Sequence, residues 1–585
     1  MGNVHSPPKP IQPPEDLHVF KGMDTVPMEY SIPEITGKRK PTDRFFLILY
    51  IFLLVVWAVV SAFTLWYSDL KRITNGYDNC GNVCGEENPY IDGINCTGKD
   101  YREEKFLLYE HSSAAFNLDN LDLEPNECVR KCDRKEYFTI MNRCFQIAHD
   151  NDSEKAMVEL DLIIDQQILQ DLKNSTGYIV GMVFIALGFC FITLILFKYL
   201  LGFIIRSVLI LTMIVSIVYV AIICTSGRKF GIGAKIFAAL LCLVLNIGVI
   251  LSWKKVNFVI RIFKETTQVI FTMPFLMLVP IWVFLIEILL TLIFIFLLVM
   301  FYTSGILTHI FGPYYTYMPT GMMVLALFST ILIFCYTCEF LNGCQRMIVA
   351  GSVSTWYFTR DKENILGSPI TESFRILIKY HLGSVAFGSF IISFMNIVRI
   401  IVKGMSKKKE FFLFRFVISC CVDFLEEVIH YISSQAYIMI AMHGEPFIPS
   451  GKRATKLLIE NALNTLAVNS IGDFVLLLVK ILITLLTIIS GFILDDGNIA
   501  FFGVVIFIGG VLAFMLAHCV FRTFEICVDT IFLCYCEDTF IHDGIERPYY
   551  APPEMQALVD EAKGIVEEEK MYNSIKTQEL PQSFV

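Results

Sequence analysis

The stretch that decides the fold of this chain is FFLILYIFLLVVWAVVSAFTLWY, residues 45–67, which carries no charge. A helix of this length extends about 35 Å, enough to cross a hydrocarbon core of roughly 30 Å. Comparable apolar runs recur along the chain: 55% of its 585 residues are hydrophobic and only 18% are charged. A soluble domain carries about a quarter charged residues. The sequence therefore predicts an all-α protein that crosses the membrane several times.

The residues before this run predict its orientation. Four basic residues precede it: Lys38, Arg39, Lys40 and Arg44. Lysine and arginine are enriched on the cytoplasmic side of membrane helices. We therefore expect residues 1–44 to form a cytoplasmic tail, residues 45–67 the first transmembrane helix, and residues 68–177 an extracellular domain.

Cysteines and glycosylation sequons independently favour an extracellular position for residues 68–177. The segment holds six cysteines: Cys80, Cys84, Cys96, Cys128, Cys132 and Cys144. It also holds all three N-x-S/T sequons of the chain, at Asn95, Asn151 and Asn174. An even number of cysteines outside the cell predicts disulfide bonds rather than metal or redox chemistry. Six cysteines allow fifteen pairings, and the sequence leaves all of them open.

Nine further apolar runs between residues 178 and 530 predict a transmembrane domain of nine more helices. The runs are 178–200, 203–224, 232–251, 269–304, 320–344, 382–402, 418–441, 474–494 and 500–526. Ten crossings place both termini in the cytoplasm, with residues 531–585 as the C-terminal tail.

Two features of the ten-helix scheme leave alternatives open. The run 269–304 contains Pro274 and Pro280, and we interpret it as one kinked helix, although two short helices would also fit. The basic segment 403–409 would face outward, against the usual charge bias. Splitting the run 269–304 would turn this segment inward, and an interfacial helix over 403–417 would also resolve the conflict.

Sequence motifs of the common enzyme and pump classes are absent. There is no phosphate-binding P-loop, no G-x-S-x-G and no H-E-x-x-H. One helix face carries Asp423, Glu426, Glu427 and His430, but the second Glu-x-x-H of a di-iron bundle does not occur in the membrane domain. We therefore expect no enzyme, no metal and no other cofactor. The net charge of −9 and the lack of a basic, aromatic-rich surface predict no nucleic-acid partner.

Charged and aromatic residues within the apolar runs indicate a site for a small organic cation. An ionisable side chain in a membrane is costly and marks a pathway or a buried partner. Glu287 lies deep in its run, and aromatic faces beside a carboxylate can hold a quaternary ammonium group. The candidate substrate-binding residues are Trp282, Glu287, Tyr302, Tyr336 and Glu339. Structural ion pairing is the alternative for the intramembrane charges, which also include Asp473, Lys480, Arg522, Glu525 and Asp529.

Four long stretches resemble the choline transporter-like family. They are DNCGNVCG at 78–85, residues 354–401 beginning STWYFTRDKENILG, AYIMIAMHGEPFIPSGKRATKLL at 436–458, and FEICVDTIFLCYCEDTFIHDGIERPYY at 524–550. The resemblance implies about ten helices, a glycosylated loop after the first, cytosolic termini and residence in the plasma membrane. It also implies sodium-independent transport of choline, or of a related cation such as ethanolamine, for phospholipid synthesis.

The sequence thus favours a carrier that binds choline near the middle of the membrane and works by alternating access. Its expected partners are a small organic cation and the lipid bilayer, and its oligomeric state is left open. Proton exchange would add a titrating group, for which His381 at a membrane edge is the candidate. The alternative is a channel or lipid-handling protein without saturable carrier kinetics, with the polar face around Asp423 lining a water-filled path.

Overall fold

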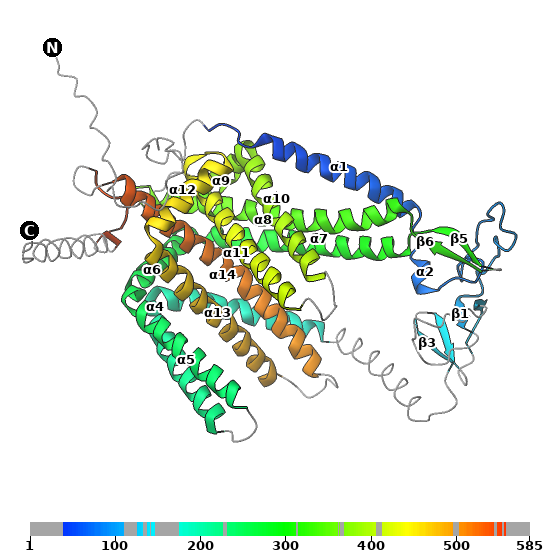
Figure 1. Ribbon diagram of the computed structural model, residues 1–585, viewed down its shortest axis with the longest axis horizontal. Coiled ribbons are helices and arrows are strands. Elements are labelled where there is room, and N and C mark those ends of the chain that lie inside the picture. The colour runs from blue at the N-terminus through cyan, green and yellow to red at the C-terminus, as the bar shows by residue number, and fades with distance from the viewer. Residues whose placement is uncertain are drawn as a thin grey trace, which may run out of the picture.

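The computed structural model describes residues 39–109, 126–132, 137–140, 142–146, 175–225, 231–311, 314–360, 362, 368–404, 412–494, 502–542, 547–552 and 555–556. The predicted sequons Asn151 and Asn174 lie outside these residues, as does most of both tails. Among the described residues, helices predominate; α1, α7 and α8 run nearly along the long axis of the molecule, whereas α5, α13 and α14 are inclined to it (Figure 1).

Seven described segments are helical, long and apolar enough to cross a membrane, which confirms the prediction of a polytopic membrane protein. They are α1 (Arg44–Trp66), α4 (Thr176–Thr225), α7 (Leu278–Thr303) with the 3-10 turn before it, α8 (Gly321–Tyr357), α9 (Pro369–Ile376) continuing into α10 (Leu382–Gly404), α13 (Ala462–Ile493) and α14 (Phe502–Ile541). The other helices are α2 (Lys71–Thr74), α5 (Ile232–Ser252), α6 (Val256–Thr272), α11 (Phe412–His443) and α12 (Phe447–Glu460).

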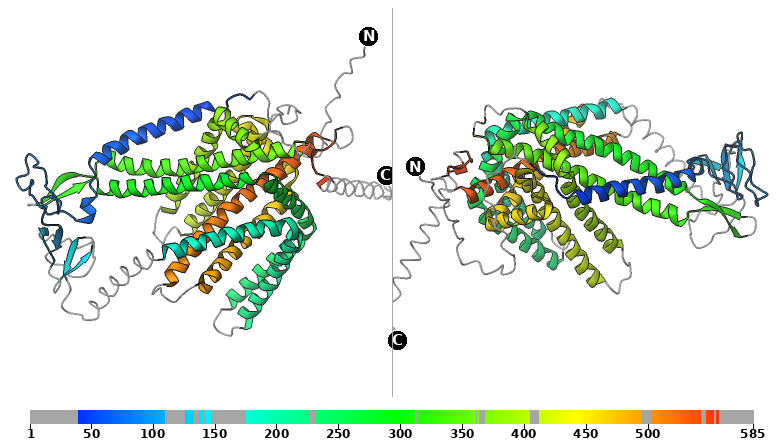
Figure 2. Two further views of the ribbon diagram at one scale, coloured as in Figure 1. Left: turned by 180° about the vertical axis from the view of Figure 1, so that it is seen from behind. Right: turned by 90° about the horizontal axis from the view of Figure 1, so that it is seen from above.

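The runs 178–200 and 203–224, predicted as two helices, form the single continuous helix α4. Only Leu201 and Gly202 separate the runs, and one glycine costs a helix about 1 kcal/mol relative to alanine, too little to end it in apolar surroundings. Figure 2 shows that α4 changes direction along its length. Its first part packs on α14, and in its second part the Ser216 hydroxyl accepts a 2.9 Å hydrogen bond from Asn246 of α5.

The proline-containing run 269–304 is broken rather than kinked. Residues up to Thr272 belong to α6, a 3-10 turn covers Pro274–Met277, and α7 begins at Leu278. Pro274 lacks an N–H and disfavours helical geometry at the residue before it, and Met273 accordingly leaves the helical region. The prediction of one helix over the whole run is therefore wrong, although a single membrane-length helix remains after the break.

Helix α8 is the centre of the membrane domain, because it contacts α1, α7, α10, α11 and α14. In Figure 1, α1, α7 and α8 run alongside one another towards the strands, whereas α13 and α14 extend into the lower part of the view. The largest hydrophobic cluster joins α8 to α4, α6, α11, α12, α13 and α14. Its largest buried side chains include Trp356, Tyr357, Phe521 and Phe524.

Three disulfide bonds hold the segment between α1 and α4, as the even cysteine count predicted. They join Cys80 to Cys96, Cys84 to Cys128, and Cys132 to Cys144. Beside them lies a four-stranded sheet in the order β2-β1-β4-β3, built from β1 (Phe106–Tyr109), β2 (Asn126–Val129), β3 (Tyr137–Ile140) and β4 (Arg143–Gln146). Strands β1 and β4 pair in parallel, and the other two pairs are antiparallel.

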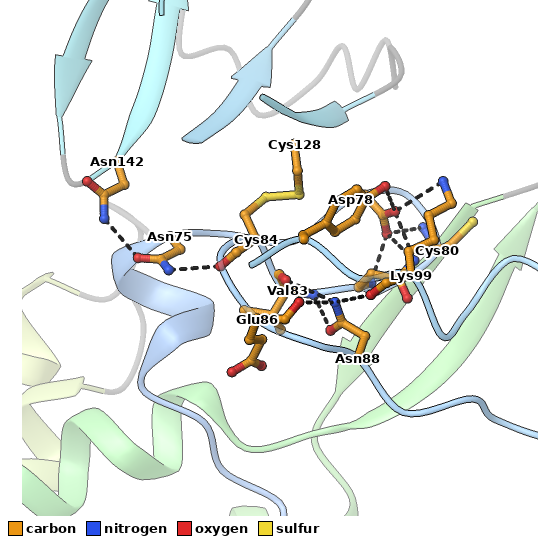
Figure 3. The surroundings of a disulfide bond; sticks show 12 residues. Asn75, Asp78, Cys80, Val83, Cys84, Glu86, Asn88, Lys99, Cys128 and Asn142 are labelled. Carbon is orange, nitrogen blue, oxygen red and sulfur yellow. Dashed lines mark hydrogen bonds and ion pairs between the residues drawn. A yellow bond between two sulfur atoms is a disulfide. The ribbon is translucent and has the colours of Figure 1, made fainter. Parts of the chain in front are cut away.

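The DNCGNVCG stretch forms a tight loop around the carboxylate of Asp78. This carboxylate accepts hydrogen bonds from the backbone N–H groups of Cys80 at 2.9 Å and Asn82 at 2.8 Å, and it pairs with Lys99 at 3.7 Å (Figure 3). Gly81 adopts φ +83°, a region that favours glycine. The glycines and the aspartate thus shape the turn that brings two cysteines to their separate partners.

A β-hairpin between α7 and α8 fastens this disulfide-bonded domain to the membrane helices. The hairpin consists of β5 (Ile306–Phe311) and β6 (Tyr314–Met318). The Tyr315 N–H donates to the Asn79 carbonyl at 2.8 Å, and the Tyr317 hydroxyl donates to the Gly81 carbonyl at 2.7 Å. Arg72 lies over the Tyr317 ring, 3.7 Å from its centroid. The domain therefore rests on the α7–α8 connection.

At the other end of α1, residues 39–43 form a strap across the ends of other helices. Arg39 donates to three carbonyl oxygens in the last turn of α11, the shortest bond being 2.7 Å to Ala441. Burial lowers the pKa of Arg39 to about 10, so its guanidinium stays charged at neutral pH, as a helix C-terminus favours. Asp43 accepts hydrogen bonds from the Phe447 N–H at the start of α12 and from Ser384 of α10. This N-terminal strap ties three helices together.

Candidate functional site

Charged side chains of the membrane domain converge between α8, α13 and α14. The Lys480 ammonium of α13 lies 2.5 Å from the Glu525 carboxylate of α14, which confirms structural pairing for these two residues. Asp473 lies near this pair, and Asp529 interacts electrostatically with Arg346. These charges belong to α8, α13 and α14, and opposite charges on different helices compensate one another within the bundle.

A cavity of about 320 Å³ opens beside these charges, between α7, α8 and α14. This volume falls in the range of small-molecule sites. The lining residues are Pro280, Phe284 and Glu287 of α7, Asn342 and Gln345 of α8, and Phe514, Met515, His518, Cys519 and Arg522 of α14. The wall thus combines two phenyl rings, one imidazole, one carboxylate, two amides and one guanidinium.

Glu287 is the carboxylate of this cavity. Its Oε1 atom is buried and accepts no hydrogen bond from any described residue. Asn342 of α8 lines the cavity beside this side chain, and Arg522 and Glu339 interact with it electrostatically. The cavity wall therefore includes a carboxylate oxygen to which no described residue donates a hydrogen bond.

Among the sequence-predicted binding residues, only Glu287 lines this cavity. Trp282 is 65% exposed and Tyr302 is 84% exposed, so both rings lie on the outer surface of α7. Tyr336 is buried, and its hydroxyl donates to the Ala386 carbonyl of α10 at 2.9 Å. Glu339 is half-buried and interacts with Arg522, a member of the cavity wall. The structure thus brings Glu287 and Glu339 into one region and leaves the three aromatic residues elsewhere.

His381, the candidate for proton coupling, lies at the N-terminal strap rather than at the cavity. It is fully buried at the end of a π-helical turn, Leu377–His381, that joins α9 to α10. Its Nδ1 atom lies 3.0 Å from the Thr42 hydroxyl, and its Nε2 atom lies 3.3 Å from the Arg39 guanidinium. Its contacts therefore connect α10 to the strap.

The polar face of α11 is divided between two surroundings. Asp423 pairs with Lys403 at 2.9 Å and Glu426 pairs with Arg399 at 2.6 Å, and both pairs link α11 to α10. Glu427 is exposed, whereas His430 is near the half-buried Arg346 of α8 and Arg522 of α14. Among the described residues, no group of three His, Cys, Asp or Glu side chains is arranged to hold a metal ion.

Sequence reasoning did not single out most of the cavity wall. Phe284 and Pro280 precede Glu287 by three and seven residues, a helical spacing that places all three on one face of α7. The residues of α14 that line the cavity recur with similar spacing. These signals become informative only once Glu287 is known to face inward, because every apolar helix contains such spacings.

A many-helix membrane domain with a charge-lined cavity, joined to a disulfide-bonded domain, is the architecture of a membrane transport protein. Residues 236–539 match the family model described as plasma-membrane choline transporter, and the chain belongs to this family. This confirms the resemblance that the four sequence stretches predicted.

Several relatives match over nearly the whole chain. Choline transporter-like protein 1 of Torpedo marmorata is 26% identical, and the match covers 90% of this chain and 93% of that protein. Choline transporter-like protein 2 of Dictyostelium discoideum is 27% identical, covering 89% and 95%. Choline transporter-like protein 3 of Homo sapiens is 25% identical, covering 89% and 91%. The similarity therefore includes the disulfide-bonded domain as well as the membrane domain.

Proposed function

We propose that this protein is a plasma-membrane carrier that moves choline, or a related small organic cation such as ethanolamine, by alternating access and without sodium. The observation that carries the proposal is the Glu287 carboxylate, whose free Oε1 atom lies in a cavity lined by Phe284 and Phe514. A quaternary ammonium has no N–H group to donate, so a carboxylate and aromatic faces are the groups that attract it.

The charge balance around the cavity supports a cationic substrate. Eight charged side chains belong to this region: Glu287, Glu339, Asp473, Glu525, Asp529, Arg346, Lys480 and Arg522. Five are carboxylates and three are basic, so the fully ionised region carries an excess of two negative charges. Such an excess raises the local concentration of cations.

Ten membrane crossings are part of the proposal. The two limbs of α4 count as separate crossings, because a straight helix of its 50 residues would extend about 75 Å, more than twice the hydrocarbon thickness. With α5 and α11 added to the seven apolar segments, the count becomes ten. In Figure 1, α1 begins and α14 ends away from the disulfide-bonded domain, in keeping with cytoplasmic termini and glycosylation at Asn95.

The decisive experiment is uptake of radiolabelled choline into sealed liposomes that contain the purified protein, with and without unlabelled choline inside. We expect saturable uptake that internal choline accelerates. Flux that neither saturates nor shows counterflow would favour the channel or lipid-handling alternative. Absence of choline flux in a folded preparation would overturn the proposed substrate.

Variants distinguish the cavity from a site on the outer face of α7. We expect Glu287→Gln to raise KM for choline about tenfold, equivalent to about 1.4 kcal/mol, because the ammonium loses its carboxylate. Trp282→Ala and Tyr302→Ala should leave uptake unchanged, since both rings are exposed. Glu372→Gln is the control, because this exposed carboxylate on α9 pairs only with nearby Arg375 among described residues. Loss of uptake in the aromatic variants alone would move the site to the sequence-predicted residues.

Proton coupling through His381 stays a prediction from the sequence. An imposed pH gradient should change the initial rate of choline uptake if protons are exchanged, and His381→Gln should abolish that response. An uptake rate that does not depend on the gradient would remove His381 from the transport mechanism while leaving the cation site untouched.

A further inference from the structure

The amide of Gln345 stands out among the residues that line the cavity. The side chain is only 3% exposed, and its Nε2 atom has no hydrogen-bond partner among the described residues. Buried amide donors are nearly always satisfied in folded proteins. An unsatisfied donor in a cavity wall is therefore a candidate partner for a ligand atom.

Gln345 and Glu287 stand at different levels of the cavity. Asn342, which lines the cavity together with Glu287, precedes Gln345 by three residues on α8, which corresponds to a rise of about 4.5 Å along the same helix face. Gln345 is thus displaced from the carboxylate level towards the C-terminal end of α8. A ligand that reaches both groups needs a positive head and an oxygen acceptor a short distance away.

Arg522 belongs to the same end of the cavity as Gln345. Helices α8 and α14 run in the same direction, because the Tyr357 hydroxyl near the end of α8 donates to Asp538 near the end of α14 at 3.2 Å. Gln345 and Arg522 are the lining residues nearest the C-terminus on their respective helices. This end of the cavity therefore carries hydrogen-bond donors, whereas Glu287 supplies an acceptor and a negative charge.

We infer that Gln345 selects substrates by the hydroxyl group of the transported cation. The ammonium head lies against Glu287 and the phenylalanine rings, and the hydroxyl oxygen, two carbons away in choline, accepts a hydrogen bond from the Gln345 amide. This inference rests on the proposed function and deepens it, because it names a specificity-determining residue at the same site. Apolar walls alone discriminate poorly, whereas a site with a donor for the hydroxyl penalises an analogue that leaves the donor unpaired.

The test compares choline with propyltrimethylammonium, in which a methyl group replaces the hydroxyl, as competing substrates in liposomes. We expect wild-type protein to favour choline about tenfold in kcat/KM. Gln345→Met keeps the length of the side chain but removes its donor, and it should bring the ratio close to one by weakening choline transport. Gln435→Met is the matched control, because Gln435 is equally buried but does not line the cavity. This control should leave the ratio unchanged.

Each outcome bears on the inference. A wild-type ratio near one overturns it even if the Gln345→Met protein fails to fold. An unchanged ratio in Gln345→Met also overturns it, and a control that equalises the two substrates would show that the effect is not specific to the cavity wall. Failure of the proposed function looks different, because neither cation would then show saturable uptake in wild-type protein.

Discussion

The buried ion pair between Glu537 and Arg453 offers a sharp test of how the membrane domain is held together. Glu537, on the last turns of α14, is completely buried, and its Oε1 atom contacts the Arg453 guanidinium of α12. His443, at the end of α11, approaches the same oxygen at 3.2 Å. One carboxylate therefore joins three helices, and we choose Glu537→Gln as the perturbation.

The expected magnitude follows from burial. Glutamine keeps an oxygen acceptor but removes the negative charge, which deprives the Arg453 guanidinium, itself only 6% exposed, of its buried counter-charge and leaves it only the more distant Glu445 carboxylate. Removing one partner of a buried ion pair typically costs about 3–5 kcal/mol. Replacing both partners by apolar side chains of similar volume is often neutral or stabilising. The double variant Arg453→Met, Glu537→Leu should therefore be more stable than Glu537→Gln.

The assay is thermal unfolding of the purified protein in detergent, followed by intrinsic fluorescence and by recovery of monodisperse protein. Glu445→Gln is the matched control, because Glu445 lies 3.9 Å from the same arginine but its side chain is 41% exposed. Its loss should cost no more than about 1 kcal/mol. The reasoning is refuted if Glu537→Gln unfolds at the wild-type temperature, or if the double variant is no more stable than the single one.

Three further predictions concern the N-terminal strap and the disulfide-bonded domain. Gly383→Ala should destabilise the protein and expose the strap to protease, because the added Cβ would lie 2.4 Å from the Thr42 carbonyl oxygen. Gly404→Ala on the same helix is the control and should leave stability unchanged, since its Cβ meets no atom within 4 Å. Replacing the Cys84–Cys128 pair by serines should lower the unfolding temperature of the disulfide-bonded domain more than replacing the Cys132–Cys144 pair. The reason is that closing loops of 44 and 12 residues stabilises the fold by about 4 and 3 kcal/mol, respectively. Equal shifts in unfolding temperature would contradict this ranking. Asn95→Gln should remove one glycosidase-sensitive mobility shift in gels, and an unchanged pattern would show that exposed Asn95 carries no glycan.

Local sequence signals predicted the secondary structure well where one energetic term dominates. The uncharged run 45–67 forms α1, Arg44–Trp66, because transfer of apolar residues into lipid depends on each residue separately. The prolines show the limit of such signals. Pro274 ends a helix and Pro280 is tolerated in the first turn of α7, and this difference depends on where the helix begins rather than on proline itself.

The candidate site was only partly predictable for a similar reason. Depth in an apolar run identified Glu287, but it could not tell which way a side chain points. Trp282 is five residues from Glu287, on another face of α7, and lies on the outer surface, while Phe284 lines the cavity. Gln345 carries no distinguishing sequence signal, because an amide near the middle of a helix is ordinary until its burial and lack of a partner are known.

The sequence by itself determined that this protein is a membrane protein of the choline transporter-like family with a disulfide-bonded domain after its first helix. Hydropathy, charge bias and cysteine number depend only on the residues of each segment, so membrane helices and a disulfide-bonded segment can be predicted from them without knowledge of packing. Only the tertiary structure decided which cysteines pair, how the N-terminal strap ties α10, α11 and α12, and which side chains of α7, α8 and α14 surround one cavity. The physical reason is that the cavity wall joins residues of α7 and α14 that lie more than 200 positions apart. Whether they face one another depends on the rotation and register of these helices, and side-chain packing across the whole bundle sets both.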